Sequence, residues 1–108
     1  MPKWAHFGNS VAILDFDADG RQDVAAAASG ESRVYIFFGP TFRRHKMFSP
    51  PGEPQQDHFG YDIAAGPVDS APGDELIVGA PDRKVGGADR AGMLFVFGAN
   101  LKRPVLKN

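Results

Sequence analysis

The 108-residue sequence contains no cysteine, so disulfide bonds, thiolate catalysis and cysteine-bound zinc are all excluded. No stretch approaches the roughly 18 consecutive apolar residues of a membrane-spanning helix, and we expect no membrane span. The formal net charge is −1, and a nearly neutral chain gives no compositional support for a nucleic-acid partner or an anionic membrane surface. Residues 1–4 do not resemble a secretory signal peptide, and we expect none in this chain.

Common catalytic signatures are missing as well. The sequence has no Gly-x-Ser-x-Gly elbow, no phosphate-binding P-loop and no His-Glu-x-x-His zinc motif. Two histidines, His6 and His58, stand before Phe-Gly pairs, and their repetition favours a packing or hydrogen-bonding role over catalysis. We therefore predict that the chain is not an enzyme.

What the sequence does contain is typical of an all-β protein. Its 13 glycines and 9 prolines recur along the whole length, as expected for short strands joined by tight turns. Hydrophobic residues make up 43% of the chain, which is compatible with a packed core. The apolar runs are too short and too often interrupted for helices, so we predict an all-β fold.

An internal repeat divides the chain into two copies. The tripeptide His-Phe-Gly at residues 6–8 recurs at residues 58–60, and this offset of 52 holds without a gap for 24 residues. The second copy then carries seven extra residues within 82–91, after which the apolar run Val34–Phe38 matches Met93–Phe97 at an offset of 59. A period near 50 residues is typical of propellers and other repeat architectures.

Each copy contains four predicted strands, which suggests one propeller blade per copy. They are Gly8–Leu14, Val24–Ala28, Arg33–Phe38 and Arg43–Phe48 in the first copy, and Gly60–Ala65, Leu76–Gly79, Gly92–Phe97 and Lys102–Lys107 in the second. The third strands are continuously apolar, which predicts that both of their faces are covered. The fourth strands carry charge and proline, which is typical of an outer edge. We predict two four-stranded antiparallel blades, residues 1–52 and 53–108.

The strongest chemical signal is an acidic loop in the first copy. Asp15, Asp17 and Asp19 alternate along the chain, so their carboxylates can converge on one cation. The backbone carbonyl of Arg21 and the carboxylate of Asp23 would complete an oxygen shell that suits Ca²⁺ better than a transition metal. The flanking segments are predicted strands, which argues against an EF-hand. The alternative is an acidic turn without metal, in which four aspartates within nine residues would repel one another.

The equivalent loop of the second copy is degenerate, because proline and alanine replace two of the acids. Asp69, Asp74 and Glu75 remain. Two prolines, Pro67 and Pro72, restrict the backbone and could hold this turn in shape without a cation. We therefore predict one calcium site per chain, in the first loop.

These features resemble the FG-GAP repeats of integrin α-subunit propellers. The matching segments are Phe7–Ala12, Asp15–Asp23, the Phe-Gly pair at 59–60 and Val78–Pro81, whereas Ala27–Ser29 stands where the repeat has Gly-Ala-Pro. The resemblance implies a calcium-stabilised blade, an extracellular or periplasmic location, and a role in cell adhesion with a protein or carbohydrate ligand. An alternative stays open, a fragment of a calcium-dependent phospholipase or hydrolase, since FG-GAP blades also accompany such domains.

Assembly is the last expectation from the sequence. Propellers usually have about four to eight blades, so two blades cannot close into a ring alone. Head-to-tail association of whole chains closes if the rotation allows it, and we expect self-association into a ring, with the trimer favoured and the tetramer next. The alternative is that the chain is a piece of a longer propeller.

Overall fold

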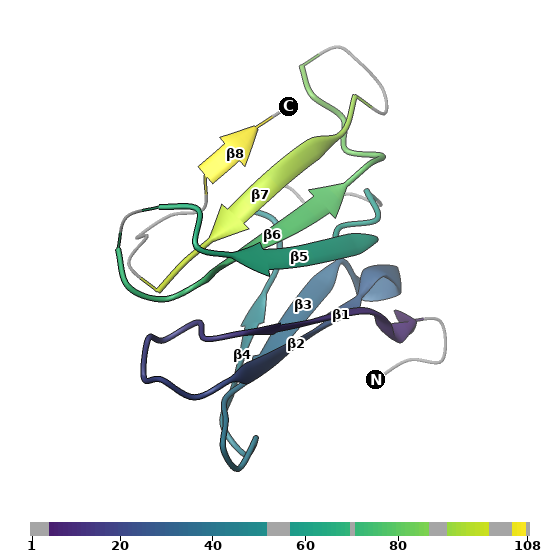
Figure 1. The fold of residues 1–108 in the computed structure, drawn as a ribbon. Helices are drawn as coiled ribbons and strands as arrows, with labels where there is room; N and C mark the ends of the chain where they lie inside the picture. The colour runs from purple at the N-terminus through teal and green to yellow at the C-terminus, as the bar shows by residue number, and fades with distance from the viewer. Residues whose placement is uncertain (1–4, 52–56, 70, 87–90, 100–104, 108) are drawn as a thin grey trace.

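The computed structural model describes residues 5–51, 57–69, 71–86, 91–99 and 105–107. They form two four-stranded antiparallel sheets, with strand orders β1-β2-β3-β4 and β5-β6-β7-β8 (Figure 1). The first sheet comprises β1 (Phe7–Leu14), β2 (Asp23–Ala28), β3 (Arg33–Phe37) and β4 (His45–Phe48). The second comprises β5 (Asp62–Gly66), β6 (Glu75–Ala80), β7 (Met93–Phe97) and β8 (Val105–Lys107). The predicted all-β class and the pair of four-stranded sheets are confirmed.

The strand ends agree with the predicted ends to within about two residues, because glycine, proline and the acidic turns interrupt the apolar runs where the strands stop. A 3-10 turn, η2 (Ser29–Glu31), joins β2 to β3 and was not predicted. Residues 102–104, at the start of the last predicted strand, lie outside the described residues, as does the predicted boundary between residues 52 and 53. That boundary therefore stays a prediction. No helix in the described part of the chain is long and apolar enough to cross a membrane.

The two sheets pack against each other and share one core, with β1 and β5 as neighbours across the boundary (Figure 1). The largest fully buried side chains from the two sheets include Leu14, Ile36, Phe59, Leu76 and Phe95. Ala25 and Ala27 of β2 belong to this core, and a Cβ added at Gly60 would lie 3.2 Å from the Ala27 Cβ, so a small side chain at Ala27 lets the second sheet approach closely. The rings of Phe48 in β4 and Phe97 in β7 meet at 4.6 Å between centroids, which extends the contact to the edge strand of the first sheet.

The fourth strand of each sheet is an edge strand, as predicted. In β4 the side chains of His45, Lys46 and Met47 are exposed. In β8 all three residues are exposed, and two of them, Val105 and Leu106, are apolar. The described part of the second edge is thus less polar than the sequence suggested.

The third strands align differently from the sequence prediction. Val24 pairs with Phe37 in the first sheet, and its equivalent at offset 52, Leu76, pairs with Phe97 in the second. The offset of the third strand is therefore 60, and the predicted offset of 59 with seven extra residues was wrong by one. A slip of one residue exchanges the two faces of a strand. Because both runs are continuously apolar, the sequence pattern could not fix the register.

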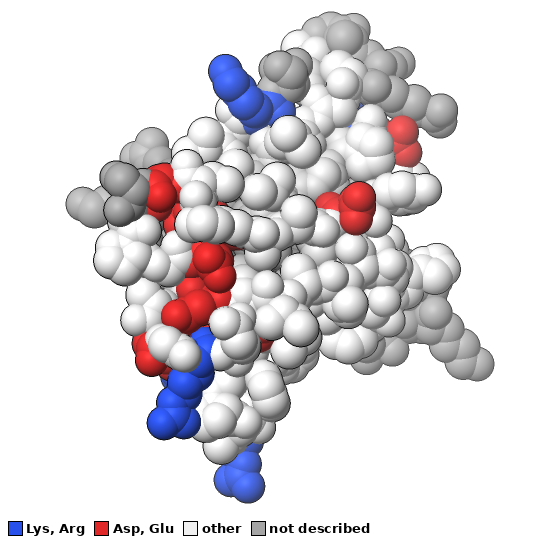
Figure 2. Space-filling model, viewed as in Figure 1, with Lys and Arg blue, Asp and Glu red and all other residues white. Residues whose placement is uncertain are grey.

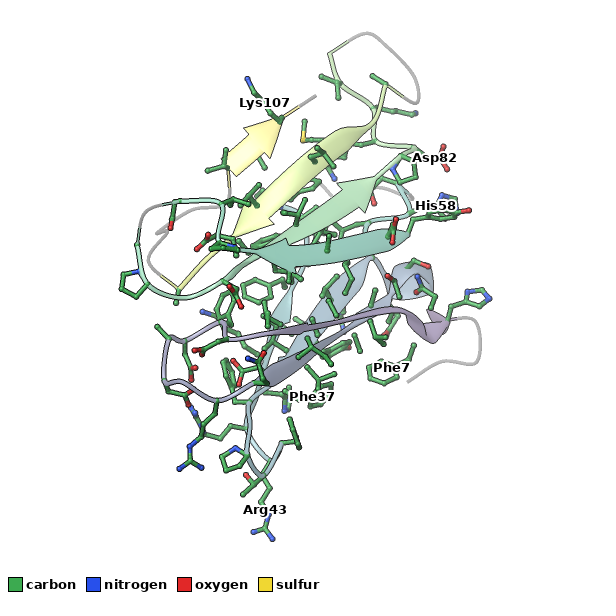
Figure 3. All side chains as sticks on the ribbon, in the orientation of Figure 1. Phe7, Phe37, Arg43, His58, Asp82 and Lys107 are labelled. Atoms are coloured by element: carbon green, nitrogen blue, oxygen red, sulfur yellow. The ribbon has the colours of Figure 1, made fainter. Side chains whose placement is uncertain are left out.

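In the corrected register, the open face of the first sheet matches the buried face of the second. The side chain of Phe7 is 48% exposed, whereas its equivalent, Phe59, is 0% exposed. Val11 is 64% exposed and its equivalent Ile63 is 8% exposed. Figure 3 places Phe7 and Phe37 on the side of the first sheet that faces away from the second. The third strands are therefore covered on one face within the described residues, and not on both as predicted.

Candidate metal centre

The β1–β2 loop brings three predicted ligands together. One carboxylate oxygen from each of Asp15, Asp17 and Asp19 lies within 4.8 Å of the others. The backbone makes this possible by turning twice through the left-handed region, at Ala18 (φ 61°) and at Gly20 (φ 83°). Left-handed backbone is costly for alanine and easy for glycine. Local hydrogen bonds must therefore hold the turn at Ala18.

Those hydrogen bonds come from the acidic side chains themselves. The two carboxylate oxygens of Asp15 accept the backbone N–H groups of Asp19 (3.1 Å) and Gly20 (3.0 Å). The Oδ1 of Asp19 accepts the N–H of Arg21 at 2.8 Å. Aspartate side chains that accept hydrogen bonds from backbone N–H groups a few residues later in the chain stabilise such loops. Two of the three carboxylates of the candidate site, those of Asp15 and Asp19, thus also shape the loop.

Asp17 is the side chain whose surroundings most favour a cation. Its Oδ1 is buried and has no hydrogen-bond partner among the described residues. Burial, followed by the charges of Asp23 and Asp19, raises the pKa of the Asp17 carboxyl above its usual range. A buried acceptor without a donor costs free energy, and a divalent cation would satisfy it. The three carboxylates therefore fit Ca²⁺, a hard ion that prefers oxygen ligands.

A positive side chain already lies beside this group. The guanidinium of Arg44 lies 3.9 Å from Asp17 Oδ2 and 5.0 Å from the centroid of the Phe38 ring. The Arg44 side chain is mostly exposed, so its ion pair with Asp17 is screened by water. In Figure 2 the acidic side chains gather on the left, at the edge where Figure 1 places the β1–β2 and β5–β6 loops.

Asp23 is not one of the three converging carboxylates, although its charge acts on Asp17. It is fully buried, and its oxygens accept the N–H groups of Phe16 and Gly39, both at 2.9 Å. Asp23 thereby connects the acidic loop to the residues that follow β3. Gly39 suits this place because a Cβ there would lie 2.2 Å from the carbonyl oxygen of Gln22. The roles of Asp23 and of the Arg21 carbonyl as ligands stay predictions.

The second loop, between β5 and β6, is held by hydrogen bonds within itself. Glu75, the equivalent of Asp23, is buried and its Oε1 accepts the N–H groups of Val68 (2.8 Å) and Asp69 (3.2 Å). The Oδ1 of Asp69 accepts the N–H of Ala71 at 3.0 Å. Val68 is the equivalent of Phe16, so the buried acid makes the same bond in both loops. Among the described residues, the group of three acids within ligand reach occurs in the first loop alone.

The two loops also bond to each other. The N–H of Asp15 donates to Asp74 Oδ2 at 2.8 Å, and the N–H of Asp74 donates to the carbonyl oxygen of Asp15 at 2.8 Å. The sequence placed Asp74 among the remnants of a metal site. In the structure it contacts the first loop instead.

Comparison with known protein families identifies the repeat to which the first sheet corresponds. Residues 7–37, which span β1 to β3, match the FG-GAP repeat family. The first sheet contains an FG-GAP repeat. The chain is also 32% identical over 81 residues, 71% of its length, to integrin alpha-5 of Xenopus laevis. It spans 8% of the length of that relative.

Outside the FG-GAP match, the structure reveals a buried ion pair that sequence reasoning missed. Arg83 donates to Asp57 Oδ2 at 2.8 Å and to the carbonyl oxygen of Pro51 at 3.0 Å, and both side chains of the pair are almost fully buried. The other oxygen of Asp57 accepts the N–H of Phe59 at 3.0 Å. The first-copy equivalent of Asp57 is Ala5, so the repeat gave no signal for the pair.

The repeated histidines before the Phe-Gly pairs share a backbone role. Both have left-handed backbone, with φ of 57° at His6 and 59° at His58. Their carbonyl oxygens accept the N–H groups of Asn9 (3.0 Å) and Tyr61 (2.7 Å), which closes the turn into each FG-GAP-like strand. The ring of His58 also bonds to Asp82, with 2.5 Å between Nδ1 and Oδ2 (Figure 3). The hydrogen-bonding interpretation of these residues agrees with this geometry.

Proposed function

We propose that this chain is a calcium-stabilised propeller module that acts by binding and assembly and not by catalysis. The observation that carries the calcium part is the group of Asp15, Asp17 and Asp19 with the unpartnered buried oxygen of Asp17. The match to the FG-GAP repeat supports the same function. Bound Ca²⁺ would neutralise the mutual repulsion of the carboxylates and so stabilise the folded chain.

Isothermal titration calorimetry tests this proposal directly. We expect one Ca²⁺ per chain, and we expect Asp17→Ala to abolish the binding heat. Asp69→Ala changes the acidic residue equivalent to Asp17 in the second loop and serves as the matched control, with binding retained. Absence of binding, or two equivalent sites per chain, would refute the proposal.

The assembly part rests on the two open sheet faces. The open face of the first sheet, with Phe7 and Val11, is equivalent to the face of the second sheet that is buried within the chain. On the other side, Leu94 is 49% exposed, whereas its first-sheet equivalent Val34 is 0% exposed. Each chain thus offers one apolar surface of each kind, and large exposed apolar surfaces mark interaction sites.

Because the two open faces are of different kinds, a second copy would join head to tail. The open face of the second sheet is hollowed by about 450 Å³ beside Tyr61, Leu94 and Lys107. The proposed product is a closed ring, with the trimer favoured and the tetramer next. Such a ring would repeat one calcium loop per chain around its axis.

Analytical ultracentrifugation decides the assembly. Wild type should sediment as a closed oligomer at micromolar concentration, and Ile13→Glu, on the open face of the first sheet, should sediment as a monomer. Arg43→Glu, an exposed change in the β3–β4 connection, is the control and should leave the oligomer intact. A stable wild-type monomer would mean that the two open faces do not pair.

The kind of ligand and the location are proposed from similarity alone. The FG-GAP repeat and the 32% identity to integrin alpha-5 favour an extracellular, adhesion-type module that binds a protein or a carbohydrate. For the alternative hydrolase function, the exposed and hydrogen-bonded pair of His58 and Asp82 is the candidate among the described residues. A panel of generic esters and phosphodiesters should give no turnover, and turnover that His58→Ala removes would favour the alternative.

A further inference from the structure

The contact between the two loops links the candidate calcium site to the second sheet. We infer that Asp74 is a positioning residue for the calcium loop, so that cation binding in the first sheet and packing of the second sheet support each other. This inference rests on the proposed calcium site. It concerns a residue of the degenerate loop, whose own metal ligands are largely lost.

The reciprocal hydrogen bonds carry the inference. Asp74 accepts the N–H of Asp15 and donates its own N–H to the Asp15 carbonyl oxygen, both at 2.8 Å. Both backbone groups of a candidate ligand are therefore held by one residue 59 positions away, in the other sheet. The Asp15 side chain in turn accepts from Asp19 and Gly20 and so organises the rest of the turn. Mutation of residues that orient metal ligands typically lowers metal affinity by about 10- to 100-fold.

The neighbouring glycine shows how closely the loops approach. Gly73 has φ of +96°, and a Cβ built there would lie 3.1 Å from the carbonyl oxygen of Phe16 and 3.3 Å from the Cβ of Ala18. Both contacts fall on the turn that gathers the carboxylates. A glycine with left-handed backbone at this point lets the second loop dock against the first.

The repeat makes this link specific to the two loops of one chain. The equivalent of Asp15 in the second copy is Pro67, which has no N–H to donate, and the equivalent of Asp74 in the first copy is Gln22. In a head-to-tail assembly the equivalent contact between copies would set Pro67 of one chain against Gln22 of the next, and it could not repeat the Asp15–Asp74 pair of hydrogen bonds. The second loop thus lacks the converging acids of the first loop and supports that loop through Asp74.

The test compares Ca²⁺ affinity by calorimetry in three variants of the full chain. Asp74→Ala removes the acceptor and should weaken Ca²⁺ binding about tenfold. Asp74→Asn keeps an oxygen that can accept from the Asp15 N–H but removes the charge, and should stay within about twofold of wild type. Asp69→Asn, an acid of the same loop that bonds within it, is the matched control and should also stay within about twofold.

Amide hydrogen exchange gives a second measurement that does not depend on the metal. In chelator, the Asp15 amide should exchange faster in Asp74→Ala than in wild type, while Asp69→Asn leaves it unchanged. Added Ca²⁺ should slow exchange of the Asp74 amide in wild type, because coupling is reciprocal. Wild-type affinity in Asp74→Ala would overturn the inference, and so would an equal loss in Asp74→Asn, which would indicate charge and not position. If wild type binds no Ca²⁺, the proposed function fails, and unchanged Asp15 exchange in chelator would then also remove the structural link.

Discussion

The β1–β2 loop and the β5–β6 loop occupy equivalent places in the two sheets and differ in their acids. The first gathers Asp15, Asp17 and Asp19, and the second has proline or alanine at two of the equivalent positions. Both keep a buried acid that accepts a backbone N–H at the base of the loop, Asp23 in the first and Glu75 in the second. The comparison separates two roles that one acidic motif would otherwise hide. The buried acid holds the hairpin, and the converging acids form the proposed cation site.

The two sheets form a second comparison with the same logic. Equivalent residues have opposite exposure because the first sheet has a neighbour on one face and the second sheet has it on the other. Phe7 and Phe59 thus lie on equivalent faces of the two sheets. The face with Phe59 is covered by the other sheet, and the face with Phe7 is open.

The comparison of faces is tested most strongly by truncating the equivalent phenylalanines. Phe59→Ala should cost about 3–5 kcal/mol of unfolding free energy, because its ring is fully buried against Phe95 and Phe97. Phe7→Ala should cost about 1 kcal/mol in dilute protein, since its ring is half exposed. Urea unfolding at low protein concentration measures both. Equal losses would contradict the view that the first sheet lacks a neighbour on this face.

Much of the fold could be predicted from the sequence because local signals mark it. Glycine, proline and the acidic turns punctuate short apolar runs, and the recurrence of Phe-Gly gave the two copies. The spacing of Asp15, Asp17 and Asp19 predicted that their carboxylates converge. In the structure the loop brings them together by turning through left-handed backbone at Ala18 and Gly20, and not as an extended segment.

What the sequence could not predict depends on contacts between distant residues. The register of β7 failed because a continuous apolar run has no alternation to distinguish its faces. Asp23 accepts hydrogen bonds from two backbone N–H groups, and Asp74 is hydrogen-bonded to Asp15. These contacts arise because the chain folds back on itself, and no sequence motif encodes them. The Asp57–Arg83 pair lies outside the matching positions of the repeat, so comparing the copies could not find it.

The second prediction separates the hairpin role of Asp23 from a metal role. Asp23→Ala should lower the unfolding free energy by about 2–4 kcal/mol in chelator, because two buried N–H groups, those of Phe16 and Gly39, lose their acceptor. Asp23→Asn keeps one carbonyl acceptor and should lose less. Urea denaturation with a chelator present measures both variants. Full wild-type stability in Asp23→Ala under these conditions would mean that Asp23 acts through a cation alone.

The third prediction concerns the calcium-dependent part of the stability. At a free Ca²⁺ concentration of 100 times Kd, binding to the folded state should add about 2.7 kcal/mol and raise Tm by several degrees. Asp17→Ala should abolish this increase, and Asp69→Ala should leave nearly all of it. Thermal melts in Ca²⁺ and in chelator give the difference for each protein. If the increase in Tm survives Asp17→Ala, or disappears in Asp69→Ala, the Ca²⁺ site does not lie in the first loop as proposed.

The smallest expected effect has the opposite sign and comes from the charge on Asp17 without metal. Burial, followed by the charges of Asp23 and Asp19, raises the pKa of the Asp17 carboxyl above its usual range, so the folded chain holds that proton more tightly than the unfolded chain does. The contribution of Asp17 to stability in chelator is therefore fully present below the usual aspartate pKa and is lost as pH rises through the raised pKa. Asp17→Asn carries no such charge and should melt roughly 1–3 °C above wild type in chelator at neutral pH. That advantage should disappear below the usual aspartate pKa, where Asp17 is protonated in both states, and it should reverse in Ca²⁺. A variant less stable than wild type in chelator at neutral pH would mean that Arg44 already offsets the charge of Asp17.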